Sequence, residues 1–372
     1  MSGSLDGLVI ADFTRVLAGP YATMLLADLG AEVIKVERPL LGDDTRSWGP
    51  PFDQQGRATY FEAVNRNKTS VAIDLRASEG QLQARDLISR ADVVMHNFAP
   101  DVAARFGLDY DSVKAIRPDV VHCAITGFGS GVGATLPGYD LLVQAMGGLM
   151  SVTGPDDQHP MKVGVALVDV ITGLHATVGV LAALRHRSET GVGQSIEVNL
   201  LSSLLSAMVN QSSAFVSGGE VPVAMGNAHP SIAPYEVYQA QDRQIVLAVG
   251  NDVQFVELCE VLGLSTIASV EKFSTNTARV TNRVELNRLI NDRLSTNTCA
   301  YWCEQLNARH VPCGPINDIS QAFALADSLG LHSIVDIELD GVTRHQVASP
   351  ITMSHTPVEY RCPPPDLPSV LE

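Results

Sequence analysis

Positive charge is scarce in this 372-residue chain. Lys and Arg number 25 against 41 Asp and Glu, which gives a net charge of −16 and a pI near 5.0. Nucleic acid and anionic membrane surfaces repel such a chain, so we expect neither as a partner. A phosphorylated ligand is still compatible with this charge, because a local cluster of Arg can oppose it.

Cysteine is scarce as well, with six residues scattered along the chain. Cys299 and Cys303 have helical i, i+4 spacing, but no second pair of Cys or His nearby completes a zinc site. We therefore expect no metal, and reduced thiols of the kind found in cytoplasmic proteins. The N-terminal MSGSLDG lacks the basic stretch and apolar run of a secretory signal, so a cytoplasmic location is expected.

No G-x-G-x-x-G fingerprint follows the first predicted strand, and Gly19 is the only glycine in its loop. Glu37 lies about where the ribose-binding acid of an NAD site would lie, but without the glycines it does not indicate such a site. The loop TRVLAGP leads instead into a predicted helix with Pro20 in its first turn. The N-terminal N–H groups of that helix could meet an anionic or thioester oxygen.

Short apolar strands alternate with helical stretches, which predicts an α/β fold with a Rossmann-like, doubly wound, mostly parallel sheet. The predicted strands are 8–13, 32–36, 70–75, 92–96, 120–125 and 195–199, and the helices of this part are 20–29, 79–90, 111–116 and 202–215. We expect residues 1–200 and 331–372 to form this large domain, 201–225 a linker, and 226–330 a smaller α/β domain with helices at 254–262, 284–294 and 300–307. A hairpin turning at Asp340-Gly341 and a Pro-rich surface tail are predicted near the C-terminus.

One long apolar stretch, from Val163 to Leu184, contains only two ionisable residues, Asp169 and His175. It is predicted to be a helix whose small residues let a second backbone approach closely, namely Ala166, Val170, Gly173 and Thr177. An unpaired carboxylate among apolar side chains is costly, so Asp169 is either capped or paired, or it is a reactive group in a dry site. The stretch is long enough to span a membrane, but a central Asp would cost about 2.5–3.5 kcal/mol there, and no membrane contact is expected. His175 is interpreted as a packed core residue.

Several segments match one family in order along the chain. They are DFTRVLAGPYATMLLADLGAEVIKVERP, the GDDTR-x-W run Gly42–Trp48, NRNKTSVAIDL, ADVVMHNFAP, ITGFG, PGYDLLVQAMGGLM, the Asp169 helix, TGVGQSIEV, GNDVQF, KFSTNTARVTNR and PCGPIND. The chain resembles the class III coenzyme A transferases, whose relatives include formyl-CoA transferase, carnitine CoA-transferase and α-methylacyl-CoA racemase. The resemblance implies an enzyme that moves CoA from an acyl-CoA to a small free carboxylic acid, with CoA thioesters as substrates and no permanently bound cofactor. It also implies an interlocked homodimer.

Asp169 stands at the family's position for the catalytic nucleophile. The resemblance implies that it attacks an acyl-CoA to give a mixed anhydride, that the CoA thiolate then forms an aspartyl-CoA thioester, and that the acceptor carboxylate reverses the sequence. Desolvation by the apolar helix would make this weak nucleophile more reactive. Tyr139 stands in PGYD where racemases carry His, and Tyr, with a reference pKa of about 10, is a poor base near neutrality. Tyr139 therefore favours a transferase, and Asp140 is either an orienting partner or a helix cap.

The residues that match the family's CoA-binding positions are Arg38, Arg76, Asn97, Phe98 and Arg105, and we assign Leu17 and Ala18 of the first loop to the same site. Arg suits the three phosphates of CoA through bidentate, charge-assisted hydrogen bonds. Each Arg alone is more often a solvated surface charge, but the set in family register with Asn97 and Phe98 favours CoA binding. Gly250 and Asn251 match a loop that closes over the active site in the family, and we assign them to catalysis.

Two departures bear on the substrate. Leu17 replaces a Gln of the formyl-CoA branch, and the glycine run of that branch is absent, so oxalate with formyl-CoA is not the expected pair. GNDVQF resembles instead the branch that uses succinyl-CoA or related dicarboxylic, aromatic or branched acyl groups. His229 and Tyr235 fit either an acceptor pocket or a structural turn. An acyl-CoA racemase or epimerase, and a non-catalytic CoA-binding protein, are the alternatives.

Overall fold

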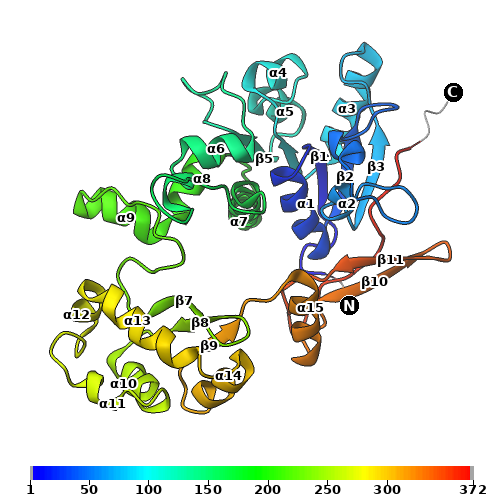
Figure 1. Cartoon of the computed structure of the whole chain (residues 1–372). Coiled ribbons are helices and arrows are strands. Elements are labelled where there is room, and N and C mark those ends of the chain that lie inside the picture. Colours follow the sequence, from blue (N-terminus) through cyan, green and yellow to red (C-terminus); the bar gives the residue numbers. More distant parts are fainter. Residues whose placement is uncertain (1–2, 369–372) are drawn as a thin grey trace. The chain divides into compact units, whose positions relative to one another are not determined.

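The computed structural model describes residues 3–368, and the chain divides into two compact units (Figure 1). The first unit comprises Met1–Met150, Lys162–Val221 and Leu331–Glu372, and the second comprises Ser151–Met161 and Pro222–Gly330. The chain therefore leaves the first unit at residue 151, returns to it at 162, and leaves it again only after the helical residues 200–218.

Six parallel strands form the sheet of the first unit. They are β1 (Val9–Phe13), β2 (Glu32–Glu37), β3 (Lys68–Ala72), β4 (Val93–His96), β5 (Val121–Thr126) and β6 (Ser195–Asn199). Their order is β3-β2-β1-β4-β5-β6, so the predicted α/β fold with a parallel sheet is confirmed. In the register, Ile10 of β1 lies opposite Val33 of β2 and Val93 of β4. The strand order reverses between β1 and β4, and ligands of such sheets bind at that switch point, beyond the carboxyl ends of the strands.

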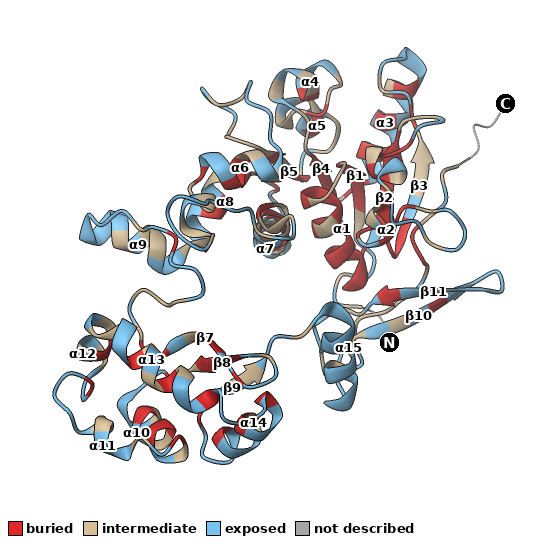
Figure 2. Cartoon of the chain, viewed as in Figure 1, coloured by how far each residue is buried: buried red, intermediate tan, exposed pale blue. Residues whose placement is uncertain are grey.

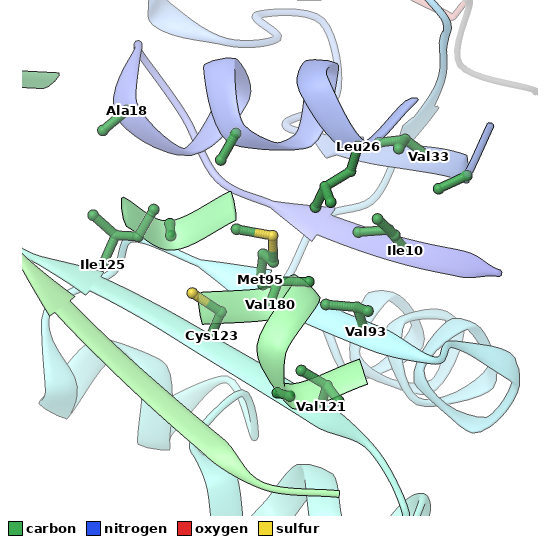
Figure 3. Close-up of a cluster of buried hydrophobic side chains, with 14 of the residues drawn as sticks. Ile10, Ala18, Leu26, Val33, Val93, Met95, Val121, Cys123, Ile125 and Val180 are labelled. Atoms are coloured by element: carbon green, nitrogen blue, oxygen red, sulfur yellow. The ribbon is translucent and has the colours of Figure 1, made fainter. Parts of the chain in front are cut away.

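Helices cover both faces of this sheet, because alternate residues along each strand bury apolar side chains on opposite sides. One face carries α1 (Ala18–Asp28), α6 (Asp140–Met146), α7 (Leu167–Thr190) and α8 (Leu200–Ala207), and the other carries α3 (Ser78–Arg90), α4 (Pro100–Arg105) and α5 (Tyr110–Ile116). Figure 3 shows the first of these two cores, where Met95 and Cys123 of the sheet meet Val180 of α7. Short helical turns lie in the connections, namely η1 (Asp44–Ser47), α2 (Thr59–Glu62) and η2 (Met150–Val152).

Helix α7 packs directly on α1. A Cβ atom built on Gly173 would lie 2.6 Å from the carbonyl oxygen of Ala18, so only glycine permits this approach. The predicted close contact of a second backbone is therefore confirmed. The helix begins at Leu167 and not at Val163 as predicted, because the chain bends before it and the Asp140 carboxylate accepts the N–H of Val168. Asp169 thus lies in the first turn and not in the middle of the helix.

The other end of α7 also differs from the prediction. The helix runs to Thr190 and not to Leu184, and Gly191 ends it with φ +72 in the left-handed conformation that closes many helices. Among residues 3–368, α7 is the one helix long and apolar enough to span a membrane by length and composition. Its buried residues belong to the core of the sheet, as in the central helix of a globular protein.

His175 is exposed, so its interpretation as a packed core residue is wrong. The buried stripe of α7 passes through Val168, Thr172, Ala176 and Val180, and His175 lies beside this stripe. The helix predicted at 202–215 is also wrong in one respect. This range contains two helices, α8 and α9 (Val209–Gly218), because the positive φ of +35 at Val209, where α9 begins, interrupts a single helix.

The C-terminal part of the first unit adds an antiparallel hairpin, β10 (Ile334–Leu339) and β11 (Val342–Val347). Its turn residues Asp340 and Gly341 both have positive φ, which confirms the predicted hairpin. The tail that follows was predicted to lie on the surface, but Pro363 and Pro364 are buried. They are held down because Arg361 donates hydrogen bonds to carbonyl oxygens at the end of α1. The last residues of that tail, 369–372, lie outside the described part of the chain.

The second unit has its own sheet and core. Its strands are β7 (Tyr235–Gln239), β8 (Gln244–Ala248) and β9 (Cys313–Pro315), antiparallel in the order β7-β8-β9. Its helices are α10 (Asp252–Val261), α11 (Ser265–Ala268), α12 (Asn276–Thr281), α13 (Arg283–Leu294), α14 (Cys299–Asn307) and α15 (Ile319–Ser328). Leu247, Phe255 and Ile290 are among its fully buried side chains. Trp302 closes this core by donating its indole N–H to the carbonyl oxygen of Leu294 at 2.7 Å.

Candidate active site

Two neighbouring clefts lie at the carboxyl ends of the sheet strands in the first unit. The first has a volume of about 460 Å³, and its lining includes Leu17, Ala18, Asn97, Phe98, Tyr139 and Asp169. The second has a volume of about 280 Å³, and its lining includes Arg38, Arg76, Phe98 and Arg105. Arg15 and Phe98 line both clefts, so the two form one branched groove at the switch point. This groove brings together all the residues that the sequence assigned to CoA, with Asp169 and Tyr139.

Asp169 is the third residue of α7, and its carboxylate is largely but not fully buried, with no positive charge contributing to its pKa. Burial, reinforced by the negative charge of Asp140, raises the pKa of Asp169 from 3.8 to about 7. Within residues 3–368 this carboxylate accepts no hydrogen bond and joins no ion pair. An unpaired, desolvated carboxylate whose pKa lies near neutrality is characteristic of groups that do chemistry.

Asp140 holds the start of α7 in place. Its carboxylate accepts the backbone N–H groups of Val168 at 2.8 Å and of Asp169 at 3.3 Å. The fully buried Gln144 fixes Asp140 through a 2.6 Å hydrogen bond to its other oxygen, and Gln144 also accepts the N–H of Val163. Of the two alternatives for Asp140, the structure contains the helix cap, although Asp140 caps α7 rather than its own helix.

Tyr139 is the residue directly before α6 and lines the first cleft. Its side chain is 62% exposed, and within the described residues its hydroxyl has no hydrogen-bond partner. A free hydroxyl at this place can donate a hydrogen bond to a carbonyl or carboxylate oxygen in the cleft.

Asn97 lines the first cleft, and its side chain also holds the backbone of the β1 loop. Its side-chain oxygen accepts the N–H of Arg15 at 3.0 Å, and its amide donates to the carbonyl oxygen of Arg15 at 2.7 Å. The Asn97 side chain, directly after β4, thereby holds the loop that follows β1 across the switch point. The Arg15 guanidinium lies over the ring of Phe98, at 5.0 Å from its centroid, where the two clefts join.

The second cleft collects positive charge. Arg76 and Arg105 have no ion pair within the described residues, while Arg38 pairs with Asp44 and donates to the carbonyl oxygen of Gly42 at 3.2 Å. Glu37 lines the same cleft but is neutralised by Arg46, whose guanidinium binds it twice at 2.7 Å. Unpaired Arg side chains around a partly apolar cleft suit a phosphorylated ligand with an aromatic part.

Comparison with known proteins identifies the family of this chain. The model of CoA-transferase family III matches residues 5–369. The chain belongs to CoA-transferase family III. It is 44% identical to a succinate–glutarate CoA-transferase of Agrobacterium fabrum, with 98% of this chain and 92% of that protein covered. It is 38% identical to the succinyl-CoA:glutarate CoA-transferase of Homo sapiens, over 97% of this chain and 83% of the human protein.

Among solved structures, the chain resembles a CaiB/BaiF family protein from Brucella suis with a TM-score of 0.87 and 41% identity, covering 99% and 97% of the two chains. The family identification from sequence motifs is therefore confirmed, and this chain is an enzyme of the class III CoA-transferases. CoA thioesters are the substrates of such an enzyme. Within residues 3–368, no group of three or more His, Cys, Asp and Glu side chains is placed to hold a metal ion.

Three residues at or near this candidate site received no role from the sequence. Arg15 lies within the TRVLAGP segment, which alone indicates no role for it, although it lines both clefts. Gln144 was quoted within PGYDLLVQAMGGLM, and its spacing of four residues from Asp140 was the available signal. Tyr60 gave no signal in the sequence. The charges of Asp169 and Asp140 contribute, after burial, to a raised pKa of Tyr60, so its ring lies near both.

Gly250 and Asn251 belong to the second unit, where they follow β8. The Gly250 N–H donates to the side-chain oxygen of Gln254 at 2.8 Å, and the Asn251 side chain caps α10 by accepting the N–H of Gln254 at 2.9 Å. The same unit contains His229 and Tyr235, whose rings meet edge to face at 5.3 Å. The catalytic roles assigned to Gly250 and Asn251 stay predictions.

Proposed function

We propose that this enzyme transfers CoA from a dicarboxylic acyl-CoA, with succinyl-CoA as the leading donor, to a free dicarboxylate, through covalent intermediates on Asp169. The observation that carries this proposal is the Asp169 carboxylate itself. It lines the first cleft, is unpaired within residues 3–368, and has its pKa raised to about 7 by burial. A carboxylate with a higher pKa is a stronger nucleophile and is still ionised in large part at neutral pH.

The chemistry proceeds by two exchanges that balance without a further reactant. The Asp169 carboxylate attacks the thioester carbonyl of the donor, and the CoA thiolate leaves as a mixed anhydride forms. The thiolate then attacks the Asp169 carbonyl, which releases the donor acid and leaves an aspartyl-CoA thioester. The acceptor carboxylate repeats these steps in reverse and leaves as its CoA thioester. Apolar surroundings protect the anhydride from water.

We assign each part of the acyl-CoA to a region of the groove. The unpaired Arg76 and Arg105 of the second cleft suit the phosphates, and Phe98 suits the adenine or the pantetheine. The thioester then enters the first cleft, where the N-terminus of α1 at Leu17 and Ala18 faces the acyl oxygen with unpaired N–H groups. The free hydroxyl of Tyr139 donates a hydrogen bond to a substrate oxygen in this cleft. The racemase alternative lacks its second base, because Tyr139 stands in place of His.

The substrate class is supported by the relatives and by one side chain. The proteins of Agrobacterium fabrum and Homo sapiens are named for succinate and glutarate, both dicarboxylates. Leu17 lines the first cleft with an apolar side chain where the formyl-CoA branch has Gln. We therefore place C4 and C5 dicarboxylates ahead of oxalate as acceptors.

A homodimer, interlocked as in the family, is part of this proposal. Helices α6, α7, α8 and α9 carry large apolar side chains that the chain leaves exposed, among them Met146, Val178, Leu205, Phe215 and Val216. Figure 2 shows that α9 is largely exposed along its length. Large exposed apolar side chains on neighbouring helices are typical of an interface. Light scattering on the purified protein should give a dimer, and a monomeric wild type at assay concentration would contradict it.

The test of the catalytic proposal is a CoA-exchange assay with covalent trapping. Wild type is incubated with succinyl-CoA and a panel of free acids, and the new thioesters and the mass of the Asp169 peptide are measured. We expect glutaryl-CoA to form and the peptide to gain one CoA, while Asp169→Asn does neither and still binds CoA. Turnover of Asp169→Asn above about a tenth of wild type, a barrier change of roughly 1.4 kcal/mol, would rule out the covalent role. Binding of CoA without exchange in the wild type would favour the non-catalytic alternative.

A further inference from the structure

The turn between β1 and α1 contains a residue whose side chain disfavours its backbone conformation. Val16 has φ +71, which lies in the left-handed region that β-branched residues avoid and glycine adopts readily. Such a conformation persists only where the surrounding contacts determine it, and it is concentrated at functional sites. Val16 lines the first cleft, directly before Leu17 and Ala18.

The contacts that determine this turn come from a fully buried ion pair. The Nζ atom of Lys35, on β2, lies 2.9 Å from Oδ2 of Asp43, and neither side chain has exposed surface. Lys35 also donates a hydrogen bond to the carbonyl oxygen of Thr14 at 3.0 Å. The Asp43 carboxylate accepts the N–H of Val16 at 3.2 and 3.3 Å from its two oxygens. The pair therefore holds the loop on both sides of Arg15.

Fold stability alone is a weak reason for such a pair. The desolvation of two buried charges can exceed their attraction, and apolar side chains of similar volume often stabilise a fold as well or better. The pair is nevertheless firmly built, since the N–H and hydroxyl of Thr45 donate to Asp43 at 3.0 and 2.8 Å. Beyond this support, the remaining hydrogen bonds of the two side chains go to the loop. Its residue Arg15 is held from the other side by Asn97.

The loop between β1 and α1 determines the position of the first turn of α1. Within residues 3–368 the N–H groups of Ala18 and Gly19 have no hydrogen-bond partner, because the helix has no side-chain cap. The backbone of Ala18 contacts Gly173, which lies one helical turn after Asp169 on α7. A change at Val16 would therefore shift these N–H groups relative to Asp169.

We propose that the buried Lys35–Asp43 pair is a positioning element for CoA transfer. By holding Val16 in the left-handed conformation, it positions the free N–H of Ala18, a residue that lines the first cleft, for the acyl oxygen that becomes negatively charged during attack by Asp169. The inference rests on the proposed function, which supplies that oxygen. Donors fixed in advance act mainly on the transition state, so the loss should fall on kcat and not on CoA affinity.

The first test is Asp43→Asn, which keeps the shape and removes the charge. We expect kcat for succinyl-CoA and glutarate to fall about 100-fold, as for other small misplacements of catalytic groups. The affinity for CoA alone, measured by calorimetry, should change less than about threefold, since the Arg side chains of the second cleft are untouched. Asp28→Asn is the matched control, because Asp28 forms an equally buried pair with Arg66 at the opposite end of α1. This control should lower the unfolding temperature and leave kcat unchanged.

Two further variants separate positioning from stability. The double variant Lys35→Met with Asp43→Leu removes both buried charges together, so neither is left unpaired, and it should stay folded and still lose kcat. Adding Val16→Gly to Asp43→Asn should restore kcat by about tenfold, because glycine adopts φ +71 without support. A structural role alone predicts no such recovery.

The outcomes are distinguishable. An active wild type with unchanged kcat in Asp43→Asn, or in the apolar double variant, would overturn the positioning role and leave the proposed function intact. An absence of recovery on adding Val16→Gly would overturn the role of the Val16 turn. No CoA exchange in the wild type, with any donor and acceptor of the panel, would overturn the proposed function and this inference together.

Discussion

The carboxylate of Asp140 accepts the backbone N–H of Asp169 at 3.3 Å, so one acidic residue caps the helix that carries the other. A negative charge at a helix N-terminus is favourable to the helix, because it meets unpaired N–H groups and the positive end of the dipole. The same charge disfavours ionisation of Asp169 and adds to the effect of burial on its pKa. The cap that builds α7 therefore also tunes the group that we propose as the nucleophile.

Replacing Asp140 by Asn tests this coupling. The amide oxygen of Asn can still accept the N–H groups of α7, but the charge is gone, so the pKa of Asp169 should fall below its wild-type value of about 7. We expect the acidic limb of the kcat/KM profile to move to lower pH, and the maximal rate to fall because a less basic carboxylate is a weaker nucleophile.

The matched control is Asp101→Asn, which removes another carboxylate that lines the first cleft but does not contribute to the pKa of Asp169. The acidic limb of the kcat/KM profile of this variant should stay at the wild-type pH. An unshifted limb in Asp140→Asn would show that the two carboxylates are not electrostatically coupled.

Asp169→Asn should stabilise the fold at alkaline pH. The pKa of Asp169 is raised from 3.8 to about 7 in the folded chain, so between these values the folded state binds more protons than the unfolded state. Ionisation of Asp169 therefore lowers stability progressively as pH rises from about 4 to 7. The carboxylate is partly exposed, and we expect the loss to be on the order of 1–2 kcal/mol rather than the full value of the shift.

The measurement is the unfolding temperature of wild type and Asp169→Asn at pH 4.5 and pH 8. The variant should unfold about 1–3 °C higher at pH 8, since each kcal/mol moves the transition by only about 1.3 °C in a chain of this size. The two proteins should unfold at similar temperatures at pH 4.5. Equal unfolding temperatures at both pH values would mean that Asp169 is not desolvated in the folded protein.

Periodicity and turn residues were sufficient to predict most of the fold. The alternation of apolar runs and helical stretches predicted all six strands of the parallel sheet to within a few residues, and Asp340-Gly341 predicted the hairpin. The start of α7 could not be predicted in this way. It depends on the carboxylate of Asp140, which accepts the N–H of Val168 and lies far away in sequence. His175 was misplaced for a related reason, since an apolar sequence does not show which stripe faces the sheet.

The candidate site was predicted from motifs, and its geometry was not. Motif positions gave the residues of both clefts, but Asn97 holds the Arg15 backbone, and the left-handed Val16 depends on Lys35 and Asp43 from another part of the chain. Such tertiary hydrogen bonds leave no local periodicity in the sequence, so only the structure reveals them.

Arg105→Ala should raise the KM for succinyl-CoA more than Arg38→Ala does. Both side chains line the second cleft, but Arg38 already pairs with Asp44, whereas Arg105 has no ion pair within residues 3–368. Phosphate contacts far from the thioester bind ground and transition states about equally, so kcat should change little. The increase should shrink at high salt, because exposed charges are screened.

Arg85→Ala, which removes an exposed positive charge outside both clefts, is the control and should leave KM unchanged. An unchanged KM in both Arg105→Ala and Arg38→Ala would remove these residues from the CoA site while leaving the assignment of Asp169 untouched.

Tyr139 decides between transfer and racemisation. A racemase needs a group opposite Asp169 that takes and returns the α-proton with a pKa near the working pH. Tyr139 is exposed and stands where the racemase branch has His, and a phenol is a poor general base near neutrality. Incubation of the wild type with a 2-methylacyl-CoA in D₂O should therefore give no α-deuterium above the uncatalysed rate, as measured by mass spectrometry.

The substitution series at this position completes the argument. Tyr139→Phe removes only a neutral hydrogen bond to substrate, worth about 0.5–1.5 kcal/mol, so transfer should fall by no more than about tenfold. Tyr139→His supplies an imidazole beside the cleft and should introduce slow α-deuteration that depends on Asp169. Rapid α-deuteration by the wild type would show that the enzyme removes and returns the α-proton. That result would overturn the proposed CoA transfer in favour of a racemase with a second base other than Tyr139.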